Sequence, residues 1–179
     1  MKIYCDTDTL FHNVKRQEEE PKTKNELLAL QKLLDCWRAG TILMFRSLVN
    51  LREIERTKSS EQLGKLRSDY DELPAIPKDE RFYGTDEMIT DPYGGRIRNP
   101  LVADVQDEDL FEKLVQRKLS KPDAQHITQA VCNECDVFLT RDEGTIIKPH
   151  RRWIEAQFPP LRVRTPSELM KEIGPLCPY

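Results

Sequence analysis

The chain has 179 residues, 38% hydrophobic and 33% charged, which is enough to bury a core in one domain without disulfides. Its formal net charge is −3, which excludes a protein held to nucleic acid by overall charge alone. No apolar run reaches the roughly 18 residues of a transmembrane helix, and the N-terminus does not resemble a signal peptide. The five scattered cysteines predict reduced thiols and a cytoplasmic protein.

The first quarter of the chain predicts alternating strands and helices. The apolar runs Lys2–Cys5 and Thr41–Phe45 each predict a short strand. Between Thr23 and Gly40, apolar residues recur at helical spacing behind a capping-box pattern, which predicts a helix. Ser47 can cap a further helix that follows the second strand.

Residues 58–104 predict an inserted or extended segment within a single domain that spans 1–179. The charged stretch 58–71 can form a helix, whereas 72–104 is rich in Pro and Gly and has no clear period. A structureless loop of that length is unusual inside a compact domain. Its mixture of aromatic and basic residues fits a single-strand binder, and a surface loop or a dimer contact explains it equally well.

The alternation returns in the second half. Helical spacing recurs over 110–119 and again after Ser120, and the apolar run Val137–Leu139 predicts a strand. Arg162 and Val163 fall in a last short strand, and Thr165 opens a terminal helix with Pro at its first position. Strands that alternate with helices predict an α/β fold, with a parallel sheet and helices on both faces.

Four acidic residues fall where such a sheet gathers its ligands. Asp6 and Asp142 each follow a predicted strand, Glu53 lies on the helix after the second strand, and Asp123 lies in the first turn of the helix before Val137. Ligands collect at the carboxyl ends of parallel strands, so we expect these carboxylates to meet there. A hard divalent cation, Mg²⁺ or Mn²⁺, relieves the repulsion among such carboxylates.

Five segments together resemble the motifs of the PIN-domain family in order and spacing. They are Cys5–Leu10, Ser47–Ile54, Asp123–Ile127, Phe138–Asp142 and Val163–Leu169. The resemblance covers nearly the whole chain, from 1 to about 57 and from about 105 to 170.

This resemblance implies a three-layer α/β/α fold with a central, mostly parallel sheet. It implies a divalent-metal-dependent endoribonuclease that hydrolyses phosphodiester bonds of single-stranded or structured RNA with a metal-activated water. Carried over position by position, the catalytic and metal-binding set is Asp6, Glu53, Asp123 and Asp142. The family also includes VapC-type toxins, which leaves open an antitoxin-like protein partner, and many members are homodimers.

Two features depart from the family's pattern. Position 8 is Asp where the family usually has Asn, and the central segment is longer than in compact VapC-type toxins. Both weaken an assignment to the toxins more than an assignment to the fold.

Two other functions remain open. Asp6-Thr7-Asp8 after a strand also resembles the Asp-x-Asp motif of haloacid-dehalogenase-type, Mg²⁺-dependent phosphatases, although Leu10 stands where that family has Thr or Val. That function would leave Glu53 and Asp123 without a role. A non-catalytic PIN-like binding module is the third candidate, and the presence of all four acids argues against it.

Structural explanations compete with a site role for several residues. Asp123 fits a helix N-terminal acid, and Glu53 fits an ion pair with a neighbouring arginine on its helix. His126 lies one helical turn from Asp123 and can orient an acid, contact a phosphate or simply pack, so it is not assigned to the site. The basic run 148–152, together with Arg46 and Arg141, fits either a nucleic-acid groove or a solvated surface.

Overall fold

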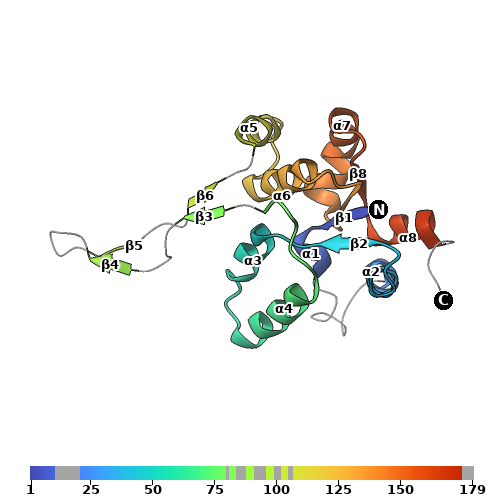
Figure 1. Cartoon of the computed structure of the whole chain (residues 1–179), viewed down its shortest axis with the longest axis horizontal. Helices are drawn as coiled ribbons and strands as arrows, with labels where there is room; N and C mark the ends of the chain where they lie inside the picture. Colours follow the sequence, from blue (N-terminus) through green and yellow to red (C-terminus); the bar gives the residue numbers. More distant parts are fainter. Residues whose placement is uncertain are drawn as a thin grey trace.

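The structure is a computed structural model, shown in Figure 1. It describes residues 1–10, 21–79, 81–83, 88–90, 96–98, 102–104 and 107–174, with side chains for 1–10, 23–79 and 107–174.

Four short strands form one sheet in which every pairing is parallel. In spatial order they are β2 (Leu43–Phe45), β1 (Lys2–Cys5), β7 (Val137–Leu139) and β8 (Arg162–Arg164). The chain passes from β1 to β2 on one side and later to β7 and β8 on the other. The carboxyl ends of β1 and β7 therefore flank the point where the strand order reverses, which is where open α/β sheets bind ligands.

Helices cover both faces of this sheet, as the alternation predicts. On one face, Ile3 and Cys5 of β1 pack in the same cluster as the buried side chains of three helices. These are α2 (Pro21–Arg38), α4 (Ser60–Glu72) and α8 (Pro166–Ile173). On the other, Tyr4 and Phe138 pack with α5 (Glu108–Gln116), α6 (Lys121–Cys132) and α7 (Lys148–Gln157). Successive strand residues point to opposite faces, so both faces are buried.

Side-chain caps fix where the helices near the carboxyl edge begin. Ser47 and Asn50 form a capping box at the start of α3 (Leu48–Ile54). Ser120 caps α6, and Pro122 occupies its first turn. These caps satisfy orphan backbone N–H groups, so the first turns of both helices are held in place.

The segment after α4 covers the free edge of β2. The Arg46 N–H donates to the Pro74 carbonyl, and the Ile76 N–H donates to the Arg46 carbonyl. The Asp79 carboxylate then accepts the Leu48 N–H at the start of α3. An exposed strand edge is a template for unwanted pairing, and this segment removes part of that edge.

Residues 58–79 of the predicted inserted segment therefore belong to the body, because Leu66 and Tyr70 of α4 and Ile76 after it lie in the core. Beyond Asp79, β3 (Arg81–Tyr83) pairs antiparallel with β6 (Val102–Asp104), and β4 (Met88–Thr90) pairs antiparallel with β5 (Arg96–Arg98). Figure 1 shows β4 and β5 farther from the sheet than β3 and β6. The predicted base-stacking role of the residues in 81–98 concerns side chains outside the described set.

The cysteines differ in part from the expectation of reduced thiols. Cys5, Cys132 and Cys135 are free, but Cys36 on α2 is disulfide-bonded, which corrects the prediction for that residue. Cysteine spacing alone does not reveal which sulfurs meet in the fold. A disulfide is uncommon in a reducing compartment, so cytoplasmic localisation stays a prediction. Within the described part of the chain, no helix combines the length and apolar character that crossing a membrane requires.

Candidate metal centre

Asp6 is held rigidly where β1 ends. It is 7% exposed, and its backbone N–H donates to the Leu139 carbonyl of β7. Its Oδ1 accepts the Thr7 N–H at 2.7 Å, and its Oδ2 accepts the Thr140 hydroxyl at 2.7 Å. The short helix α1 (Thr7–Leu10) begins directly after it. The carboxylate is therefore oriented by donors that follow the two central strands, Thr7 after β1 and Thr140 after β7.

A buried asparagine ties α3 to the end of β1. The side-chain amide of Asn50 donates to the Cys5 carbonyl at 3.1 Å and to the Thr7 hydroxyl at 3.0 Å. Its oxygen accepts the Ser47 N–H at 2.7 Å. This link places α3, and with it Glu53 one turn further on, beside the Asp6 carboxylate.

His126 reaches the same point from α6. Its Nε2 lies 3.1 Å from Glu53 Oε2 and 3.6 Å from Asp6 Oδ1. On the other side of the ring, Nδ1 lies 2.7 Å from the Tyr4 hydroxyl, which is itself 2.6 Å from the Ser47 hydroxyl. Asp6, Glu53 and His126 thus form a triad whose ligand atoms all lie within 4.8 Å of one another.

Asp123 and Asp142 form a second, more exposed pair beside the triad. The Thr145 hydroxyl lies 2.6 Å from Asp142 Oδ2 and 3.4 Å from Asp123 Oδ2. The Asp142 N–H also donates to the Thr140 hydroxyl at 3.0 Å, and that hydroxyl donates to Asp6. The hydroxyls of Thr140 and Thr145 therefore link Asp6, Asp142 and Asp123 in one network.

In the triad, a buried imidazole lies between two carboxylates. Burial opposes a charged imidazole, but the hydrogen bond to Glu53 and the charge of Asp6 raise the pKa of His126 above its ordinary value. Burial also disfavours the Glu53 carboxylate, yet its bond with His126 lowers the pKa of that carboxyl overall. Burial raises the pKa of Asp6, and the charge of Glu53 adds to this effect.

Asp8 adds a fifth carboxyl group next to Asp6. Its Oδ2 accepts the Arg141 N–H at 2.9 Å, and the Arg141 guanidinium donates to the Asp8 carbonyl. Its Oδ1 is buried and accepts no hydrogen bond from the residues that the structure describes. Burial, with the charges of Asp6 and Asp142, raises the pKa of Asp8 well above its ordinary value. The centre thus holds a buried carboxylate with one oxygen that accepts a hydrogen bond and one that accepts none from the described residues.

We expect Asp8→Asn to stabilise the metal-free protein at pH 7.5 by about 1–2 kcal/mol, because it removes an incompletely paired buried charge. The pKa of Asp8 is higher in the folded protein than in the unfolded chain. Ionised Asp8 therefore begins to destabilise the fold once the pH exceeds its pKa in the unfolded chain, and this destabilisation grows as the pH rises toward its pKa in the folded protein. The gain should therefore vanish near pH 3, where Asp8 is protonated in both states. Urea unfolding in EDTA at both pH values measures this, and destabilisation at pH 7.5 would contradict it.

The donor set fits a divalent cation. Carboxylate oxygens are the ligands that Mg²⁺ and Mn²⁺ prefer, and an imidazole nitrogen in the set shifts the preference toward Mn²⁺. Burial raises the pKa values of Asp6 and Asp8, and Asp8 Oδ1 accepts no hydrogen bond from the described residues, so a bound cation would offset an unfavourable negative charge here. Asp6 and Glu53 would hold the ion, with His126 as a ligand or as the residue that orients them.

All four acids predicted from the sequence lie in this region, but they do not form one cluster. Asp6 and Glu53 belong to the triad, whereas Asp123 and Asp142 form the neighbouring pair. His126, which the sequence analysis left unassigned, is the third member of the triad. The signals for it in the sequence were its spacing of one helical turn from Asp123 and its place in the Asp123–Ile127 segment that resembles a PIN-domain motif.

The basic run 148–152 and the two arginines grouped with it, Arg46 and Arg141, do not form one basic surface. The Arg151 guanidinium donates to the Val163 carbonyl and to Glu168, and that of Arg46 donates to the Leu73 carbonyl and stacks on Tyr70. Both arginines therefore bind structural partners. Arg141, in contrast, lies in the centre beside Asp8.

In comparisons with known proteins, no protein-family model matches the chain, and neither a curated protein nor a solved structure matches it significantly. The functional argument therefore rests on the geometry of the centre and on the motifs themselves.

Proposed function

We propose that this protein is a divalent-metal-dependent endoribonuclease with a PIN-like fold. The observation that carries the proposal is the triad of Asp6, Glu53 and His126, whose ligand atoms lie within 4.8 Å of one another at the carboxyl edge of a parallel sheet. The pair Asp123 and Asp142 beside it completes the set of four acids that the PIN resemblance implies.

The centre's own residues would perform three tasks. Asp6 and Glu53 hold the cation, and the Thr7 N–H and Thr140 hydroxyl fix the Asp6 carboxylate. Asp123 and Asp142 lie at the more exposed side, where one of them can accept a proton from the attacking water. A bound Mg²⁺ or Mn²⁺ would activate that water and stabilise the leaving oxygen of the phosphodiester.

The gathering of four acids also supports a nuclease over a haloacid-dehalogenase-type phosphatase. That function would use Asp6 and Asp8 and would leave Glu53, bonded to His126 at 3.1 Å, without a role. A non-catalytic binding module would have no need for carboxylates whose pKa values burial raises, as it does for Asp6 and Asp8. An antitoxin-like partner and a homodimer remain proposals that depend on the same resemblance.

The test is cleavage of a mixed-sequence single-stranded RNA pool by the full chain with Mn²⁺, with Mg²⁺ and with EDTA. We expect metal-dependent products that carry a 5′-phosphate and a 3′-hydroxyl, and no cleavage in EDTA. A small aryl phosphate tested in parallel should not be hydrolysed. Hydrolysis of that ester without RNA cleavage would instead support the phosphatase, and failure to bind Mn²⁺ in a titration would support a non-catalytic module.

A further inference from the structure

Basic side chains lie on both sides of the acidic centre. On the α3 side, Arg52 and Arg56 flank Glu53 in the sequence. The positive charge of Arg56 helps to lower the pKa of the Glu53 carboxyl. The Arg52 guanidinium reaches across to α6 and donates to Gln125 Oε1 at 3.0 Å. Cationic groups therefore border the edge of the centre that Glu53 forms.

A second group of cations borders the side that Asp123 forms. We call it the basic rim, and it consists of Arg117, Lys118, Lys121 and His150. The first three are exposed and lie from the end of α5 to the start of α6, two to six residues before Asp123. Arg117, Lys118 and Lys121 form no ion pair with a side chain that the structure describes, so these three cations are available to an anionic ligand.

Packing between helices brings the rim together. The Arg117 guanidinium lies 5.0 Å from the centre of the Trp153 ring on α7, which fixes the end of α5 against that helix. His150, one helical turn before Trp153, experiences the charges of both Arg117 and Asp123, although burial is the main cause of its lowered pKa. The rim is therefore continuous from α5 across α7 to the acidic pair.

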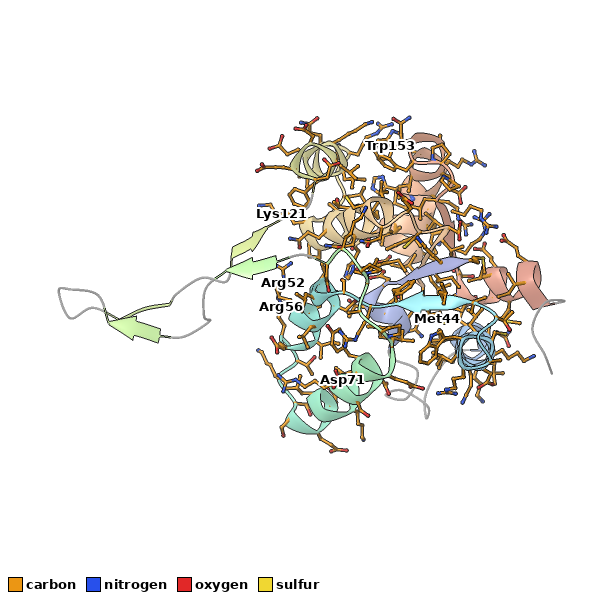
Figure 2. All side chains as sticks on the ribbon, in the orientation of Figure 1. Met44, Arg52, Arg56, Asp71, Lys121 and Trp153 are labelled. Atoms are coloured by element: carbon orange, nitrogen blue, oxygen red, sulfur yellow. The ribbon has the colours of Figure 1, made fainter. Side chains whose placement is uncertain are left out.

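The two basic groups face the same way. Figure 2 shows Arg52 on α3, Arg56 in the turn just after it and Lys121 on α6 along one side of the body, the side from which β3 and β6 extend. Glu53 lies on α3 beside the first group, and Asp123 lies on α6 beside the second, whereas Asp6 and Asp142 follow β1 and β7. A chain with a formal net charge of −3 holds a polyanion only through such a local arrangement of charge.

We infer that a single-stranded RNA crosses the acidic centre from the Arg52–Arg56 side to the basic rim, so that phosphates on both sides of the cleaved bond are bound. This inference rests on the proposed function and deepens it, because it assigns substrate-binding residues. It follows that the protein acts on a strand of several nucleotides and binds a dinucleotide poorly.

The test is fluorescence anisotropy of a labelled twelve-nucleotide single-stranded RNA with the full chain in EDTA, where cleavage does not interfere. Arg117→Ala combined with Lys121→Ala should weaken binding about tenfold near 0.1 M salt. It should also reduce the slope of log Kd against log salt by about 1.4, since each phosphate contact on a single strand contributes about 0.7. Arg52→Ala with Arg56→Ala should act similarly.

The matched control is the double variant Lys24→Ala with Lys32→Ala, which also removes two positive charges. Both lysines are exposed on α2, and this helix packs against α8, away from the centre. It should leave both affinity and slope unchanged. Wild-type affinity in the rim variant, together with metal-dependent RNA cleavage by the wild type, would overturn this inference and leave the proposed function intact. If the wild type cleaves no RNA and binds none, both fail together.

Discussion

Asp6→Asn is expected to abolish metal-dependent RNA cleavage, with a loss of at least about 100-fold. Replacing a residue that only hydrogen-bonds to a metal ligand already lowers metal affinity or activity about 10–100-fold, and Asp6 is proposed as a ligand itself. Asp6 is central to the candidate centre, since its carboxylate lies 3.6 Å from His126 Nε2 and is oriented by Thr7 and Thr140. Asn keeps the shape of the side chain but removes the charge that would bind the cation. The measurement is single-turnover cleavage alongside a Mn²⁺ titration by calorimetry.

The matched control for this variant is Asp136→Asn. Asp136 directly precedes β7, at the opposite end of the sheet, where its carboxylate accepts the Lys2 N–H at 2.7 Å. That variant should retain both cleavage and Mn²⁺ affinity. Unfolding by urea should show that Asp6→Asn remains folded. Full metal-dependent cleavage by Asp6→Asn would show that the reaction does not take place at this centre.

Asn50→Ala is expected to lower the free energy of unfolding by about 3 kcal/mol, because buried groups left without partners each cost about 1–3 kcal/mol. The variant removes a buried side chain that joins the Cys5 carbonyl, the Thr7 hydroxyl and the Ser47 N–H. Mn²⁺ affinity should fall as well, since Thr7 lies 3.2 Å from His126 Nε2 and helps to lower the pKa of Glu53. Urea unfolding in EDTA and a Mn²⁺ titration measure the two effects.

Asn25→Ala provides the comparison for this second variant, because Asn25 is exposed on α2 and its replacement should change stability by less than about 0.5 kcal/mol. Should Asn50→Ala prove as stable as this control, Asn50 would not be the link between α3 and β1. Loss of stability without any change in Mn²⁺ affinity would separate its structural role from the organisation of the centre.

Local sequence patterns account for much of the fold. The apolar runs at Lys2–Cys5 and Val137–Leu139 form the two central strands, and the predicted helix after Ser47 begins with the capping box that its residues favour. These features depend on residues within a few positions of one another, so periodicity and caps reveal them. Three helical segments were not predicted: α1, the π-helical turn η1 (Glu143–Ile147), and α7, into which η1 leads. All three are short or rich in polar residues.

Chain order and local patterns were enough to predict the alternation of strands and helices and to place Asp6 and Asp142 after strands, because these features depend on neighbouring residues. The packing of helices across the sheet, in contrast, brings His126 into a triad with Asp6 and Glu53. It also leaves Asp8 Oδ1 without a hydrogen-bond donor among the described residues and gathers basic side chains of the α5 end, α6 and α7 beside the acids. The cause is separation along the chain. His126 meets residues 73 and 120 positions away, and contacts of that range depend on how helices pack across the sheet, which no local pattern encodes.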